Sequence, residues 1–146
     1  MKIAIGSDHR GFLLKGKLKR LLRQSKIAVI DVGCHSDKSC DYPLFASKVA
    51  NLVSQQRVDF GILICKTGIG SSIAANKVKN VRAALCYNIK SARLSRQHNN
   101  ANVLVLGSDF VTLERAKRII EEWLSAKYQG GRHERRLELI SQIEEG

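Results

Sequence analysis

Residues 58–77 read VDFGILICKTGIGSSIAANK, and this stretch decides the fold. Its apolar run as far as Cys65 predicts a buried β-strand, and the glycines at 68 and 70 predict a tight turn. Small and apolar residues at helical spacing follow over 72–78. A strand that turns directly into a helix is the building block of α/β domains.

The same alternation extends along the whole chain. Strand-like runs begin at Lys2, Ile27, Val58, Val81 and Asn102, and read KIAIGS, IAVIDVG, VDFGILIC, VRAALCY and NVLVLG. Helical spacing covers 11–25, 44–55, 72–78, 89–97 and 112–127, and a last helical segment, RHERRLELISQIEEG, covers 132–146. Continuous apolar strands between helices predict a parallel sheet with helices on both faces, which is a three-layer α/β/α fold.

Length and composition limit the classes of protein. A chain of 146 residues suits one domain, residues 1–146. No apolar run approaches the roughly 20 residues of a membrane span, and the first residues turn polar too early for a signal peptide, so we expect a cytoplasmic protein. The four cysteines lack C-x-x-C spacing, which favours reduced thiols and gives no zinc motif.

The formal net charge of +12 favours anionic partners of every kind, from phosphorylated metabolites to nucleic acid. The basic residues of the first predicted helix motivate a nucleic-acid-binding function as the rival class; they are Lys15, Lys17, Lys19, Arg20, Arg23 and Lys26. Against this rival, aromatic residues make up only 5% of the chain, and no known RNA or DNA motif is present.

Parallel sheets bind ligands at the carboxyl ends of their strands, so the residues after each run are the candidates for function. After Cys65, the glycine-rich turn offers backbone N–H groups and a helix start, a geometry that holds an oxyanion. The turn matches neither a Walker loop nor a full dinucleotide fingerprint. Cys65 is either a thiolate held among these donors or an inert core cysteine, and the turn alone leaves both open.

Three further groups of residues are ambiguous when each is taken alone. Asp8, after the first strand, either contacts a ligand or caps the next helix, and His98 is either an acid or a helix cap. Arg132 and Arg136 share one helical face and suit a phosphate, or form a solvated basic face. The apolar stripe of that last helix packs either on its own domain or on a partner subunit.

Together these segments resemble one family over nearly the full length of the chain. The motifs are GSDHRGF at the start, DYP from Asp41, CxTGIGxSIAANK from Cys65, SRQHNNAN from Ser95 and GGRHxxR from Gly130. The chain is similar to ribose-5-phosphate isomerase B, in the family shared with galactose-6-phosphate isomerase. The resemblance implies a doubly wound, Rossmann-like sheet of five parallel strands, and a homodimer or dimer of dimers with active sites shared between subunits.

The resemblance also implies a reaction and a site. The reaction is the aldose–ketose isomerisation of ribose 5-phosphate to ribulose 5-phosphate in pentose phosphate metabolism, through an enediolate and without metal or cofactor. Cys65 is implied as the base, Thr67 and the turn of Gly68, Ile69 and Gly70 as enediolate stabilisers, and His98 as the ring-opening residue. Sugar contacts are implied for Asp8, His9 and Asn99, and a phosphate clamp, reaching from the neighbouring subunit, for Arg132 and Arg136.

One position departs from the family pattern, because Lys66 stands where the family usually has glycine. Its ammonium either attracts the anionic substrate and favours the Cys65 thiolate, or its side chain narrows the pocket. If that position requires positive φ, a lysine there also strains the backbone by about 1 kcal/mol or more. A six-carbon substrate such as allose 6-phosphate or galactose 6-phosphate is therefore the alternative within the same reaction class.

Overall fold

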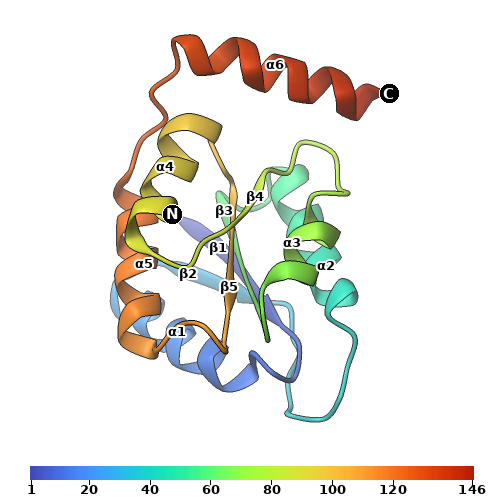
Figure 1. Cartoon of the computed structure of the whole chain (residues 1–146). Helices are drawn as coiled ribbons and strands as arrows, with labels where there is room; N and C mark the ends of the chain where they lie inside the picture. The colour runs from blue at the N-terminus through green and yellow to red at the C-terminus, as the bar shows by residue number, and fades with distance from the viewer.

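The computed structural model describes residues 1–146 and contains five strands that alternate with helices (Figure 1). The strands are β1 (Lys2–Ser7), β2 (Ala28–Asp31), β3 (Phe60–Cys65), β4 (Ala83–Leu85) and β5 (Val103–Gly107). The helices are α1 (Phe12–Gln24), α2 (Tyr42–Ser54), α3 (Ile69–Ala75), α4 (Ile89–Asn99), α5 (Leu113–Ser125) and α6 (Arg132–Glu145). No helix is long and apolar enough to cross a membrane.

All strands are parallel, in the order β2-β1-β3-β5-β4. One apolar core lies between the sheet and α1, α4 and α5, and a second core lies between the sheet and α2 and α3. Figure 1 shows these two helical layers on either side of the strands. The three-layer, doubly wound five-stranded sheet predicted from the sequence is thereby confirmed.

Helix α3 begins at Ile69, three residues earlier than the periodicity predicts. The cause is Gly68, whose φ of +82° reverses the chain immediately after the strand. A Cβ at this position would also collide with the Leu85 side chain, so only glycine fits. The start of α3 is therefore brought directly against the end of β3.

Helix α6 lies apart from both layers, across the amino-terminal edge of the sheet (Figure 1). Its only buried residue is His133, whereas its apolar side chains Leu139, Ile140 and Ile143 are exposed. The helix follows Gly130 and Gly131, which both have positive φ. Its own chain therefore leaves most of the apolar stripe uncovered.

Candidate active site

The sheet changes winding direction between β1 and β3, and ligands of such folds bind outside this switch point. Ser7 pairs with Ile64 at the carboxyl ends of these two strands, so Asp8 and Cys65 follow adjacent strands at one edge. Asp8 is buried, and its Oδ1 accepts the N–H groups of Arg10 and Gly11, both at 3.0 Å. Asp8 thus fixes the turn before α1. The N-cap position of α1 itself is occupied by Gly11, not by Asp8.

His9 is half-buried at the same edge, and its orientation is fixed from the loop before α2. The backbone N–H of Cys40 donates to His9 Nδ1 at 3.2 Å. Burial, and then the neighbouring Cys34 thiol, raise the pKa of the Cys40 thiol. The Cys40 thiol is therefore a neutral neighbour of His9. Because His9 Nδ1 accepts the Cys40 N–H, Nε2 is the ring nitrogen available to a ligand.

Cys65 ends β3 with only 4% of its surface exposed. Its Sγ accepts the N–H of Gly68 at 3.2 Å, so the turn that follows the strand wraps around the sulfur. The segment that follows β5 is also hydrogen-bonded to Cys65, because the Ser108 N–H donates to the Cys65 carbonyl at 2.9 Å. The thiol is consequently held in one place at the carboxyl edge.

Several N–H groups in this turn have no acceptor within the chain. They belong to Thr67, Gly70 and Ser71, whereas the Ile69 N–H donates to Thr67 Oγ1 at 3.2 Å. The first turn of a helix always leaves such donors, and here they lie within a few residues of a buried thiol. Chemically, the arrangement offers a base and N–H donors for an oxygen that becomes negatively charged.

Two tyrosines at this edge were not singled out as site residues by the sequence. The Tyr42 ring covers Gly70 so closely that a Cβ there would overlap it, and the Tyr87 hydroxyl donates to the Thr67 carbonyl at 3.2 Å. Tyr42 belongs to the DYP motif of the family resemblance, and Tyr87 follows β4, at the end of a predicted strand. Both therefore lie in segments that the sequence analysis identified as relevant to function. Only the tertiary structure shows that they contact the turn.

Lys66 causes no backbone strain, because it is not among the non-glycine residues with positive φ. Its side chain is 55% exposed, and its ammonium lies 3.9 Å from Asp109 Oδ2. An exposed ion pair at this distance contributes little to stability. Lys66 therefore adds a solvent-facing positive charge beside Cys65 and leaves the turn undistorted.

His98 and Asn99 lie at the opposite edge of the sheet from Cys65, near the carboxyl end of α4. From there the chain enters β5, whose last residue, Gly107, pairs with Cys65. At about 3.3 Å per residue, the five residues of β5 separate the two edges by about 13 Å. Within one chain, His98 and Asn99 are thus not brought together with Cys65.

The second edge has its own cluster of residues around α6. The His98 and His133 rings are stacked, with centroids 4.3 Å apart. Burial, followed by electrostatic interactions with His98, Arg132 and Arg136, lowers the pKa of His133. Both arginines are exposed and form no ion pair, so they are free to bind an anion.

The predicted site residues thus divide into two groups. The base group comprises Asp8, His9, Cys65, Thr67, Gly68, Ile69 and Gly70. The clamp group comprises His98, Asn99, Arg132 and Arg136. Of five surface grooves of about 250 to 720 Å³, none is lined by Cys65 or Thr67, and one is lined by Asn99. The side chains form no cluster of three or more potential metal ligands.

Comparisons with known proteins agree with this arrangement of elements. The family model described as Ribose/Galactose Isomerase matches residues 3–140. Ribose-5-phosphate isomerase B of Escherichia coli (strain K12) is 52% identical over 144 residues, which cover 99% of this chain and 97% of that protein.

Solved structures are similar over the whole chain. The Clostridium thermocellum ribose-5-phosphate isomerase B superimposes with a TM-score of 0.98 at 50% identity, covering 99% of this chain and 98% of that one. The Mycoplasma genitalium ribose-5-phosphate isomerase B, solved with bound ribulose-5-phosphate, superimposes with a TM-score of 0.95 at 46% identity, covering 99% and 96%.

Proposed function

This chain belongs to the ribose/galactose isomerase family, and on that premise we propose that it interconverts ribose 5-phosphate and ribulose 5-phosphate. Relatives named ribose-5-phosphate isomerase B match it over almost the entire length. The observation that carries the proposal is the buried Cys65 thiol beside the unpaired N–H donors of the following turn.

In this proposal Cys65 acts as a thiolate base. Isomerisation moves one proton from C2 to C1 of the open-chain sugar and one hydroxyl proton from the C2 oxygen to the C1 oxygen, and in between a negative charge develops on the former carbonyl oxygen. Thr67 and the N–H groups of the turn stabilise that charge, which is carried by an oxygen of the enediolate. Every group required for the proton transfer is supplied by side chains and backbone of the protein, and residues 1–146 act as one isomerase domain.

The clamp group reaches the substrate of a second subunit. About 13 Å of β5 separates the two edges in one chain, and the stripe of α6 is uncovered. A symmetric dimer in which α6 docks on its partner would bring His98, Arg132 and Arg136 to the partner's Cys65. His98 would then assist ring opening, and the arginines would hold the phosphate away from the reacting carbons.

The reduced state of the four cysteines fits a cytoplasmic enzyme, which we include in the proposal.

Initial rates with a panel of five- and six-carbon aldose phosphates test the function. We expect the highest kcat/KM for ribose 5-phosphate. A higher kcat/KM for allose 6-phosphate or galactose 6-phosphate would show that the proposed substrate is wrong and the proposed type of reaction right. The absence of turnover with every sugar phosphate in the panel would reject the proposal. The Lys66→Gly variant belongs in the same panel, because it shows whether this added charge changes the preference.

A further inference from the structure

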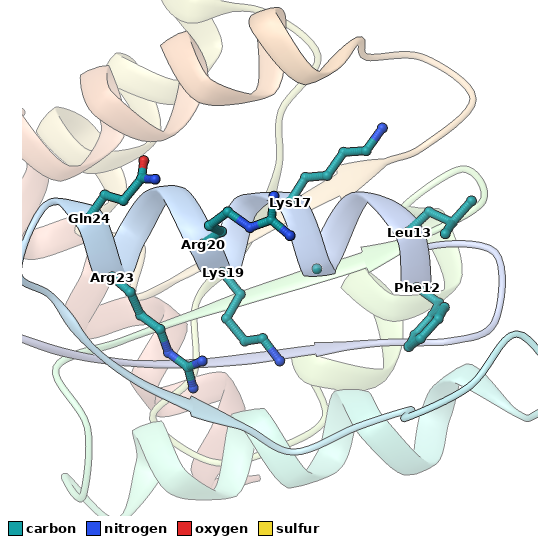
Figure 2. Close-up of a pocket in the computed structure, with 8 residues that line it drawn as sticks. Phe12, Leu13, Lys17, Lys19, Arg20, Arg23 and Gln24 are labelled. Carbon is teal, nitrogen blue, oxygen red and sulfur yellow. The ribbon is translucent and has the colours of Figure 1, made fainter.

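A shallow groove of about 720 Å³, open to solvent and lined entirely by residues of α1, runs along the outer face of this helix (Figure 2). Figure 2 shows Phe12 and Leu13 at one end of it and the basic side chains of the same helix farther along. This groove is the largest of those described above, and it contains none of the residues of the proposed active site.

The positive charge of this face is not compensated locally. Between Asp8 and Asp31 the chain has seven lysines and arginines and no acidic residue. Two of them are paired, because the buried Lys15 and the partly exposed Lys19 bind the two oxygens of Asp31 at 2.7 and 2.8 Å, although Lys19 also lines the groove. Lys17, Arg20 and Arg23 are exposed and have no ion-pair partner; Figure 2 shows Lys17 and Arg23 extending to opposite sides of α1, with Arg20 between them.

The hollow itself results from Gly16, in the middle of the helix. A Cβ added there would meet nothing within 4 Å, so no packing contact inside the chain requires glycine at this position. Glycine within a helix is less stable than alanine by about 0.5 to 1 kcal/mol. The missing side chain leaves room for a ligand to approach the backbone between Leu13 and Arg20.

The charge of the groove decides which kind of occupant fits. A second copy of α1 would bring like charges face to face, which opposes self-association through this surface. A polymer with regularly spaced negative charges matches the row from Lys17 to Arg23, which extends about 9 Å along the helix. The apolar end at Phe12 and Leu13 offers contacts for the face of a base.

We propose that the α1 groove binds single-stranded nucleic acid, as an activity additional to and independent of the isomerase reaction. The three unpaired cations contact phosphates, and Gly16 lets the strand lie close to the helix. With three phosphate contacts, log K should fall with log salt with a slope of about −2, which is about 20-fold weaker binding between about 50 and 200 mM salt.

The test is a titration of a fluorescein-labelled oligouridylate with the full-length enzyme, followed by fluorescence anisotropy at several salt concentrations. The variant Lys17→Gln/Arg20→Gln/Arg23→Gln should lose most of the affinity and of the salt slope, while kcat/KM for the sugar phosphate stays at the wild-type value. The matched control, Lys38→Gln/Lys48→Gln/Arg57→Gln, loses the same charge from exposed positions outside α1. It should retain most of the affinity.

Gly16→Leu distinguishes binding within the groove from nonspecific attraction by the positive charge of the protein, because it places a side chain in the hollow and changes no charge. We expect it to weaken oligonucleotide binding severalfold and to raise the melting temperature, since leucine is the better helix former. Equal losses in the control and the α1 variant would overturn the proposal, as would unchanged affinity of Gly16→Leu. Absence of binding at about 50 mM salt, or equally tight binding of polyglutamate, would overturn it too.

Discussion

Two inactive variants should restore activity to each other if each active site is shared between subunits. The first variant is Cys65→Ala, which removes the base, and the second is Arg132→Ala/Arg136→Ala, which removes the phosphate clamp. In one chain these groups belong to opposite edges of the sheet, and the length of β5 separates the two edges by about 13 Å. In the proposed dimer, every active site combines one edge from each subunit.

The expected magnitude follows from the symmetry. In a heterodimer of the two variants, one site receives both intact groups and the other receives neither. Random exchange at equal concentrations gives about half heterodimers, so about a quarter of all sites should be active, against almost none in either variant alone. If instead the clamp served its own chain, each site would carry one defect and mixing would restore nothing.

The assay is the initial rate of ribose 5-phosphate isomerisation after the two variants have been incubated together. Native mass spectrometry of the mixture measures the fraction of heterodimer, and the regained rate should rise in proportion to it. Abundant heterodimer without a regained rate would refute the shared site and leave the reaction assignment in place.

Four further perturbations test the chemistry and the stability. Cys65→Ala should lower kcat by about 10²-fold or more with little change in phosphate binding; a fall of less than about tenfold would contradict the role of a general base. Prolonged chelation with EDTA should leave the rate unchanged, and a loss that a divalent ion reverses would reject the mechanism. Asp31→Asn should destabilise the fold by about 3 to 5 kcal/mol, measured by urea unfolding, because the buried Lys15 ammonium would lose its charged partner and keep only the Cys34 carbonyl as a full acceptor. In the wild type, burial alone would raise the pKa of Asp31, but hydrogen bonds from Lys15 and Lys19 lower it from 3.8 to about 2. The resulting stability is present above about pH 4 and should be lost as the pH falls toward 2; a flat stability profile over that range would contradict the ion pairs.

The parts of the fold that depend on local patterns were predictable from the sequence. Each strand is a continuous apolar run and each helix has its own spacing, so the three layers followed directly. The start of α3 did not, because periodicity cannot show that Gly68 reverses the chain in a single residue. The short β4 is a similar case, since only three residues of its longer apolar run pair with β5.

The base group of the candidate site was equally predictable from the sequence, because Asp8 and Cys65 follow strands that lie next to each other. The division into two edges was not predicted from spacing. His98 ends a helix that runs back from the carboxyl edge, and its distance from Cys65 depends on β5. Its stacking on His133 also required the tertiary structure, as did the contacts of Tyr42 and Tyr87 with the turn.

The uncovered stripe of α6 has a consequence for how the enzyme is measured. If Leu139, Ile140 and Ile143 are buried only in the assembly, dilution shifts the equilibrium toward chains that each hold two incomplete sites. The rate per mole of chain should then decline below the dissociation constant of the dimer, and kinetics at very low enzyme concentration would report assembly as well as chemistry. In that case, a catalytic rate for this protein has meaning only together with the enzyme concentration at which it was measured.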